Sequence, residues 1–281
     1  METDTGTRIE DVARRCVAAL RNTPAGVFSD FDGTLSDIAP TPGDARAFPG
    51  TEEALNRVAR LVDATGIITG RAVADVQTKL DVDHLLIVGN HGLEWFENGE
   101  HVDHEAGIAA ADGIAETLFE TERRLAKEIS TASMLWENKR LTASVHYRNV
   151  EDPVDVGMRL LPIINEEASK RGLRVSSGKM LVELRPSAIV SKGTALEQII
   201  RNRGLRSAIF FGDDVTDVDG FRALHRMREN EQVDTIAIAI RSMDVHPEVI
   251  SEADVVLEGV PDTVAILNRI ADLLETGEGG R

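Results

Sequence analysis

The fold class of this chain is decided by the stretch Val27-Phe28-Ser29-Asp30-Phe31-Asp32-Gly33-Thr34-Leu35. A short apolar run ends here in two aspartates spaced i, i+2, and a glycine follows. Because residues i and i+2 of a strand point to one face, Asp30 and Asp32 are expected to leave the strand together, and Gly33 allows a sharp turn. Two such carboxylates repel each other unless a divalent cation lies between them, or unless one attacks while the other handles protons. The alternative is a strand that ends in a solvated acidic turn.

The pattern Asp30-x-Asp32-Gly33-Thr34 resembles the signature of the haloacid-dehalogenase-like phosphatases. The resemblance implies that Asp30 attacks phosphorus and that Asp32 is the general acid and base. It also implies a Mg²⁺ cofactor, and it predicts a phosphatase.

A second strand ends in a cluster of carboxylates, in Ile209-Phe210-Phe211-Gly212-Asp213-Asp214-Val215-Thr216-Asp217. In the resembled superfamily this is the metal-binding motif, and hard oxygen ligands suit Mg²⁺. Asp217 would support the loop. An acidic helix N-terminus, with Asp and Thr as caps, is the alternative interpretation. The implied magnesium ligands are Asp30, Asp32 through its backbone carbonyl, Asp213, and Asp214 directly or through water.

Two weaker motifs lie between these two, in the chain order that the superfamily requires. Ile67-Ile68-Thr69-Gly70-Arg71 reads as a strand that ends in a hydroxyl residue and a glycine, and Ser191-Lys192-Gly193 precedes a helical pattern. By resemblance, Thr69, Gly70 and Lys192 bind the phosphate. A lysine can hold the nucleophilic carboxylate and the transferring phosphoryl group in one place.

Outside the middle of the chain, apolar strands alternate with helices. This pattern predicts an α/β fold with a doubly wound parallel sheet, Rossmann-like, whose ligands bind at the carboxyl ends of the strands. The expected strands are 26–31, 66–69, 85–89, 208–212, 235–240 and 254–257. The expected helices are 8–21, 51–62, 73–80, 193–203, 215–228 and 261–274.

The middle of the chain has a different pattern, a helix and a hairpin that occur twice. The expected elements are helices 107–130 and 153–171, with hairpins over 134–148 and 173–185. Such a unit is α+β, with two helices on one face of a small antiparallel sheet. In the resembled superfamily a cap inserted here closes over the substrate. The predicted domains are therefore a core of residues 1–103 and 188–281 and an inserted cap of residues 104–187.

Several further motifs look like those of the trehalose-6-phosphate phosphatase family. They are Gly89-Asn90-His91-Gly92-Leu93-Glu94, Glu137-Asn138-Lys139, Val145-His146-Tyr147-Arg148, and Ser177-Gly178-Lys179 with Glu183-Leu184-Arg185-Pro186. The alternative places the cap residues on solvated strand faces, and it makes His91 a structural loop residue. The substrate-binding residues that the resemblance implies are Arg71, His91, Lys139, His146, Arg148, Lys179 and Glu183.

The composition limits the function classes. The formal charge is −17, from 48 acidic and 31 basic residues, which argues against nucleic acid and anionic membranes as partners. Cys16 is the single cysteine, so a cytosolic location is expected. Arginine supplies 25 of the basic residues and lysine six, which fits either a salty cytoplasm or a codon bias.

The activity that the resemblance implies is Mg²⁺-dependent hydrolysis of a sugar phosphate through an aspartyl-phosphate, with trehalose 6-phosphate as the expected substrate. Its synthase is expected to be a separate chain. The alternatives are a phosphatase for sucrose 6-phosphate or mannosyl-3-phosphoglycerate, a phosphosugar phosphomutase, and a catalytically silent sugar-phosphate sensor.

Overall fold

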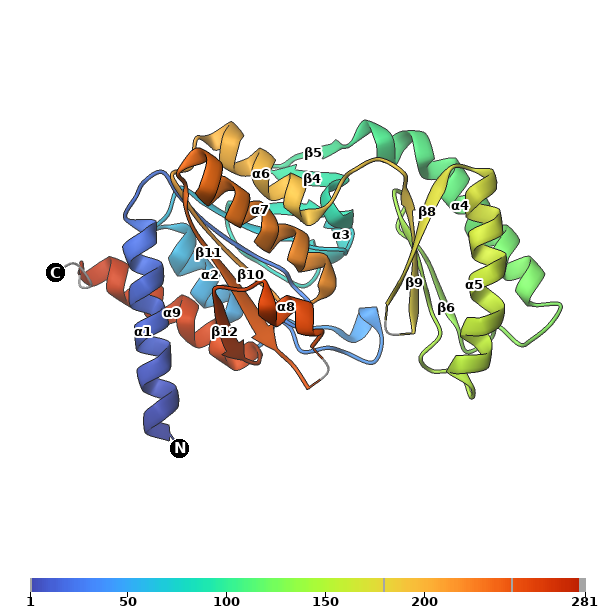
Figure 1. Ribbon diagram of the computed structural model, residues 1–281, viewed down its shortest axis with the longest axis horizontal. Helices are drawn as coiled ribbons and strands as arrows, with labels where there is room; N and C mark the ends of the chain where they lie inside the picture. The colour runs from blue at the N-terminus through green and yellow to red at the C-terminus, as the bar shows by residue number, and fades with distance from the viewer. Residues whose placement is uncertain (1, 179, 244, 278–281) are drawn as a thin grey trace. The chain divides into compact units, whose positions relative to one another are not determined.

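The computed structural model describes residues 2–178, 180–243 and 245–277, and it divides into two compact units (Figure 1). Unit 1 comprises Met1–His101 and Val190–Arg281, and unit 2 is the insertion Val102–Ile189. The boundaries expected from the sequence lie after residues 103 and 187. No helix among the described residues is long and apolar enough to cross a membrane.

Unit 1 is built on an eight-stranded sheet in the order β12-β11-β10-β1-β2-β3-β4-β5. The pairs from β12 through to β3 are parallel, which confirms the expected parallel sheet. β1 lies between β10 and β2, so the strands that carry the two aspartate motifs are neighbours. The strands are β1 (Ala25–Ser29), β2 (Ala64–Ile68), β3 (Leu86–Gly89), β4 (Glu94–Glu97), β5 (Glu100–Asp103), β10 (Ser207–Gly212), β11 (Asp234–Arg241) and β12 (Val255–Glu258).

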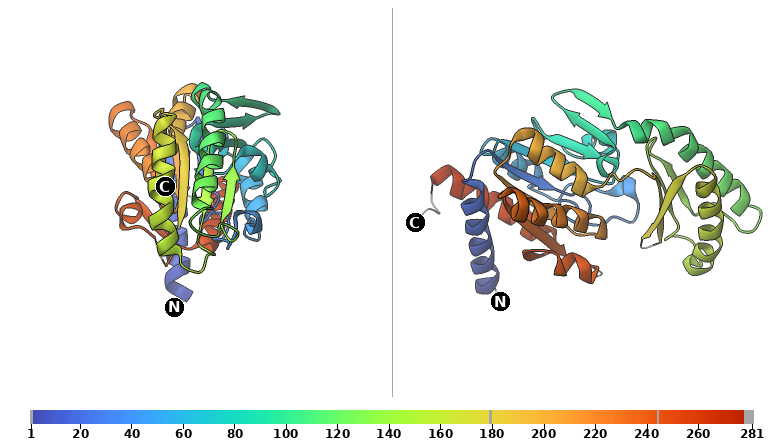
Figure 2. Two further views of the ribbon diagram at one scale, coloured as in Figure 1. Left: turned by 90° about the vertical axis from the view of Figure 1, so that its right-hand side faces the viewer. Right: turned by 45° about the horizontal axis from the view of Figure 1, so that its top comes forward.

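Helices cover both faces of this sheet, because its strands are apolar on both sides (Figures 1 and 2). Successive strand residues alternate between two cores: Val27 packs with α1, α2, α3 and α9, and Phe28 packs with α6, α7 and α8. The helices are α1 (Glu2–Leu20), α2 (Thr51–Ala59), α3 (Val73–Gln77), α6 (Lys192–Arg203), α7 (Val215–Glu231), α8 (Pro247–Ser251) and α9 (Val260–Thr276).

The short helix α8 and the two strands at one edge of the sheet, β4 and β5, were not expected from the sequence. β4 pairs with β3 in the antiparallel sense, so the sheet is mixed at this edge. The turn between β4 and β5 contains Asn98 and Gly99, both with positive φ (52° and 85°). An Asn-Gly pair is a strong hairpin signal. The flanking strands escaped notice because they are short and carry charged, partly exposed side chains.

Unit 2 is a four-stranded sheet in the order β6-β7-β9-β8, with α4 and α5 on one face (Figures 1 and 2). All three strand pairs are antiparallel, as expected for the two hairpins. The elements are α4 (Glu105–Leu125), β6 (Leu135–Asn138), β7 (Ala143–His146), α5 (Pro153–Lys170), β8 (Leu173–Gly178) and β9 (Leu181–Pro186). The apolar side chains of one sheet face pack under the helices, and the opposite face carries the polar residues discussed below.

Candidate active site

Asp30 and Lys192 meet at the carboxyl end of β1. Lys192 Nζ lies 2.9 Å from Asp30 Oδ2 and 2.8 Å from Asp217 Oδ1. All three residues are buried, with Lys192 2% exposed and Asp30 5% exposed. A buried ammonium group requires anionic partners, so the three side chains form one charged unit.

Local structure dictates this meeting. The backbone N–H of Asp30 continues the β1–β10 ladder by donating to Phe211 O at 2.8 Å, so Asp30 leaves the sheet beside the strand that leads to Asp213. Ser191 caps α6: its side chain accepts from the N–H of Thr194, and Thr194 Oγ1 accepts from the N–H of Ser191. This capping box fixes Lys192 as the first residue of the helix.

Carboxylate oxygens of Asp30, Asp213 and Asp217 lie within 4.8 Å of one another, which makes them a candidate cation site. Asp217 has other partners, because Oδ1 binds Lys192 and Oδ2 accepts from the N–H groups of Asp213 and Asp214 at 3.1 Å each. Asp217 therefore holds the loop and the lysine, and Asp30 and Asp213 are the candidate ligands of this group.

One carboxylate oxygen in this cluster is left unsatisfied by the residues that the structure describes. Oδ1 of Asp30 is buried, and within the described part of the chain no donor lies at hydrogen-bond distance from it. An unsatisfied buried carboxylate oxygen beside a second carboxylate is a suitable donor set for a hard cation. Asp214, which the sequence also suggested as a ligand, lies exposed at the start of α7 and outside the group of three.

The carboxyl groups of the cluster are hard to ionise without further positive charge. Burial, together with the nearby Asp217 and Asp32, raises the pKa of Asp30 to about 7, although Lys192 opposes this shift. Burial, together with the nearby Asp30, Asp217 and Asp214, raises the pKa of Asp213 well above its usual range. A bound cation inverts this electrostatic situation, because it favours the ionised carboxylates.

Asp32 points to a different cation, Arg71. The Nε and Nη2 atoms of Arg71 donate to the two oxygens of Asp32, each at 2.6 Å. Arg71 also donates through Nη1 to Asp75 at 2.5 Å and to the backbone oxygen of Pro42 at 2.9 Å. The two motif aspartates, only two residues apart, are thus held by separate basic side chains.

Thr69, Gly70 and His91 lie together at the ends of β2 and β3. The backbone N–H of His91 donates to Thr69 O at 2.8 Å, and that of Arg71 donates to Thr69 Oγ1 at 3.3 Å. A Cβ on Gly70 would lie 2.5 Å from His91 Nε2, so only glycine fits beneath this imidazole. His91 is 5% exposed and has a φ of +58°, a conformation that a rigid surrounding must maintain.

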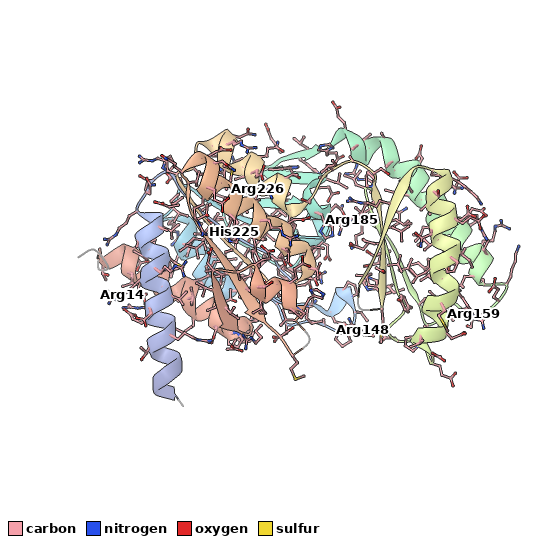
Figure 3. The ribbon with its side chains drawn as sticks, in the orientation of Figure 1. Arg14, Arg148, Arg159, Arg185, His225 and Arg226 are labelled. Carbon is pink, nitrogen blue, oxygen red and sulfur yellow. The ribbon has the colours of Figure 1, made fainter. Side chains whose placement is uncertain are left out.

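In unit 2, the structure places predicted residues on and beside the sheet face opposite the helices. His146 Nε2 lies 2.7 Å from Glu137 Oε2. Arg185, which Figure 3 labels, donates to Glu183 at 2.5 Å. Lys139 lies half-buried in the turn after β6, and Arg148 lies exposed after β7. Lys179 lies outside the described residues.

Glu137 and Arg185, the partners of His146 and Glu183, stand in the motifs quoted above but were not predicted as site residues, and neither was Ser144. Glu137, Ser144 and Glu183 are directly opposite one another in register across β6, β7 and β9, so their side chains share one face. Ser144 is 1% exposed, and its hydroxyl has no hydrogen-bond partner among the described residues. The alternation of polar residues along each strand was the available signal.

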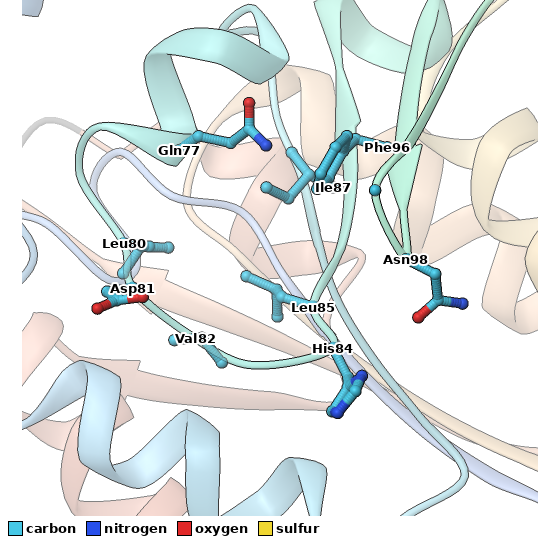
Figure 4. A pocket seen from close by; sticks show the side chains of 10 residues that line it. Gln77, Leu80, Asp81, Val82, His84, Leu85, Ile87, Phe96 and Asn98 are labelled. Atoms are coloured by element: carbon cyan, nitrogen blue, oxygen red, sulfur yellow. The ribbon is translucent and has the colours of Figure 1, made fainter.

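A cavity of about 270 Å³ also exists in unit 1, lined by residues of segments 77–87 and 96–99 (Figure 4). It contains none of the predicted site residues, and it lies by the turn after α3 and the β4–β5 turn. The candidate active site is therefore identified by its converging charged groups and not by this cavity.

The fold is that of a haloacid-dehalogenase-like hydrolase: a hydrolase of this class from Bacteroides thetaiotaomicron has a TM-score of 0.60 at 14% identity, and the match covers 90% of this chain and 98% of the other. A trehalose-6-phosphate phosphatase related protein has a TM-score of 0.73 at 24% identity over 90% and 100% of the two chains. The C-terminal domain of Candida albicans trehalose-6-phosphate phosphatase also gives 0.73, at 18% identity over 94% and 96%.

The chain belongs to the trehalose-phosphatase family, whose sequence model matches residues 28–260. A trehalose-phosphate phosphatase from Mycobacterium avium is 32% identical over 261 residues, which is 90% of this chain and 63% of that protein. A Mycobacterium tuberculosis protein described as an uncharacterized glycosyl hydrolase is 41% identical over 207 residues, 70% of this chain and 15% of its own length. The chain thus spans less than two thirds of the length of these relatives.

Proposed function

We propose that this protein hydrolyses trehalose 6-phosphate to trehalose and phosphate. The observation that carries the proposal is the buried Asp30 carboxylate, with one oxygen held by Lys192 and the other without a hydrogen-bond partner among the described residues. Family membership supports the substrate, since several mycobacterial relatives are named trehalose-phosphate phosphatase.

In the first half of the reaction, a carboxylate oxygen of Asp30 attacks phosphorus. A bond forms between that oxygen and phosphorus, and the bond from phosphorus to the sugar oxygen breaks. Asp32 donates a proton to the departing sugar oxygen, which leaves as the hydroxyl of trehalose.

In the second half, water attacks the phosphorus atom of the aspartyl-phosphate. Asp32, now ionised, accepts a proton from that water, and the bond between phosphorus and Asp30 breaks. Both aspartates return to their starting states, and inorganic phosphate is released. One residue therefore serves first as acid and then as base.

Phosphate binding falls to Lys192, Thr69 and Gly70. Lys192 is already fixed between Asp30 and Asp217, so its charge is available to the phosphoryl group without rearrangement. Thr69 offers a hydroxyl, and its loop is supported by His91. These residues would bind the phosphate group of any phosphate ester and do not recognise the sugar.

Magnesium fits this donor set, because no donor in the described part of the chain binds Asp30 Oδ1, and Asp213 lies beside it. Asp30, the backbone carbonyl of Asp32 and Asp213 would hold the ion, with Asp214 acting directly or through water. When bound, Mg²⁺ supplies positive charge that stabilises the phosphoryl oxygens.

Recognition of the sugar falls to Lys139, His146, Arg148, Lys179 and Glu183 of unit 2. Basic side chains attract an anionic ligand in a protein of charge −17, and Glu183 can accept hydrogen bonds from sugar hydroxyls. The cytosolic location and the separate synthase chain remain predictions.

The direct test is phosphate release from a panel of sugar phosphates with the purified protein. We expect trehalose 6-phosphate to be the preferred substrate, with trehalose as the product. Faster release from sucrose 6-phosphate or mannosyl-3-phosphoglycerate would contradict the substrate. Transfer of the phosphoryl group to another sugar position would indicate a mutase, and absence of turnover would indicate a sensor.

Glu183→Ala tests whether the cap residues recognise the sugar of the substrate. We expect kcat/KM for trehalose 6-phosphate to fall about 10- to 1,000-fold, the scale of one or two buried polar contacts. Hydrolysis of p-nitrophenyl phosphate, which has no sugar, should change little. Glu120→Ala is the matched control, since Glu120 also pairs with an arginine, Arg123, but on α4. Equal losses for both substrates would contradict this division of labour.

A further inference from the structure

Almost all hydrogen-bonding capacity of Arg71 is used within the protein. A guanidinium group has five N–H donors. Nε and one N–H of Nη2 bind the two oxygens of Asp32, and the two N–H groups of Nη1 bind Asp75 and the oxygen of Pro42. Among the described contacts, one N–H group is left for any other partner.

One face of the guanidinium group is covered as well. Its carbon lies 5.4 Å from the centre of the Phe31 ring, a cation–π distance, and Phe31 is fully buried. The Arg71 side chain is 9% exposed. A substrate could bind at most the one remaining N–H group without displacing protein partners, which argues against the substrate-binding role that the family resemblance implied.

Asp32 needs such a partner, because its own surroundings do not fix it. Its side chain is 34% exposed, and the next residue, Gly33, has a φ of +72° in a turn. A short, partly exposed carboxylate on a turn can adopt several rotamers. The fork of Arg71, which contacts both oxygens, selects one of them.

We infer that Arg71 is the positioning residue of the proton-transferring carboxylate Asp32. The inference rests on the proposed function, in which Asp32 protonates the leaving group. It assigns one cation to each aspartate: Lys192 holds the nucleophile Asp30, and Arg71 holds Asp32. Loss of the fork should therefore impair proton transfer to the leaving group and spare the attack on phosphorus.

Arg71→Lys tests this inference, because it keeps the charge and removes the bidentate fork. The measurement is the rate of aspartyl-phosphate formation in the first turnover, by rapid chemical quench, with two substrates at saturation. With trehalose 6-phosphate, whose sugar oxygen must be protonated, we expect a rate about 10- to 100-fold lower, within the range of general acid catalysis. With p-nitrophenyl phosphate, whose leaving group departs as a stable anion, we expect a change of less than about three-fold.

Each other outcome overturns the inference. Equal slowing with both substrates would mean that Arg71 supports the phosphate loop through Thr69. A raised KM for trehalose 6-phosphate with an unchanged first-turnover rate would mean that Arg71 binds the substrate.

Asp75→Asn supplies a second variant if Arg71→Lys folds poorly. Asp75 is 39% exposed and anchors the outer side of Arg71, so the substitution should be tolerated. We expect a smaller slowing, still confined to trehalose 6-phosphate, and no selective slowing would contradict the inference. Arg57→Lys is the control, since Arg57 pairs with Asp272 and Glu275 away from the site. Failure of the wild type to form a phosphoenzyme would overturn the proposed function instead.

Discussion

Two clusters of three carboxylates, one in each unit, differ in how their charge is balanced. In the site cluster of unit 1 a single ammonium group serves three aspartates. In the helix cluster of unit 2 three basic side chains serve three glutamates and tie α4 to α5. The site cluster consists of Asp30, Asp213, Asp217 and Lys192. The helix cluster consists of Glu116, Glu166, Glu167, Arg124, Lys170 and Arg171.

The pKa values of the two clusters move in opposite directions. Burial raises the pKa of Asp30, Asp213 and Asp217. Hydrogen bonds from basic side chains lower the pKa of Glu166 and of Glu167 to about 2 each, with Arg124 the main cause for Glu166 and Lys170 for Glu167. The helix cluster is complete as it stands and stabilises unit 2. The site cluster lacks positive charge, which is the expected state of a site that takes up a cation and a substrate.

Asp30→Asn should have the largest effect among the substitutions that test this difference. The amide is nearly isosteric but a poor nucleophile, so turnover should fall by more than about 1,000-fold. Stability should stay the same or rise, because a buried and incompletely paired carboxylate is removed while Lys192 keeps Asp217. Phosphate release and thermal unfolding of the same preparation measure both effects. Retention of more than about a thousandth of the activity would show that another group attacks phosphorus.

Metal removal is the next test, and only the site cluster should respond. Turnover should require Mg²⁺ and stop in excess EDTA, and Ca²⁺ should inhibit because its larger, looser coordination shell misplaces the attacking group. Without substrate, Mg²⁺ should raise the Tm of the wild type. A ligand present at 100 times its Kd increases the free energy of unfolding by about 2.7 kcal/mol. Asp213→Asn should lose this rise and Glu167→Gln should keep it. Full activity in chelator would contradict the metal site.

The sequence predicted the site cluster better than the helix cluster. Asp30, Lys192 and Asp213 stand at strand ends or a helix start, where the α/β topology alone brings side chains together. The helix cluster could not be foreseen, because Arg124 and Glu167 are 43 residues apart and meet only once α4 and α5 pack. The resemblance implied a substrate-binding role for Arg71. The sequence could not show that this side chain binds Asp75 and the backbone oxygen of Pro42, because Pro42 lies on a separate segment. Register across β6, β7 and β9, which aligns Ser144 with two glutamates, was also beyond the sequence.

Glu167→Gln is a moderate test, of stability alone. Glu167 accepts from Arg124, Lys170 and Arg171 at 2.5–3.0 Å, and its side chain is 6% exposed. The amide keeps the shape and removes the charge, so we expect a loss of about 1–3 kcal/mol in unfolding free energy, the scale of charged hydrogen bonds. Phosphate release at ordinary temperature should be unchanged. Equal stability of the variant and the wild type would show that the cluster is only a solvated surface network.

The contribution of Glu167 to the free energy of unfolding should depend on pH, and the direction of that dependence is defined. The pKa of Glu167 is lowered from 4.5 to about 2 in the folded state, so its contribution is present above pH 4.5 and is lost as the pH falls through 2. Urea unfolding between pH 6 and pH 2.5 should therefore show the wild type and Glu167→Gln converging as the pH falls. A constant difference over that range would contradict the assignment.

The dependence of Tm on salt is the smallest effect that we expect. It distinguishes the contribution of local ion pairs to stability from that of the net charge. Salt weakens the exposed ion pairs of the helix cluster, but it also screens the repulsion that a charge of −17 causes. If that charge reflects a salty cytoplasm, Tm should rise by several degrees between 0.1 M and 2 M KCl at pH 7.5, and more in Glu167→Gln, which has fewer pairs to lose. Near pH 5, close to the pI of about 4.8, the net charge almost vanishes, so the rise should shrink. A Tm that is flat in KCl at pH 7.5 would favour codon bias as the source of the arginine-rich composition, and a rise that persists unchanged at pH 5 would show that screening of the net charge is not its cause.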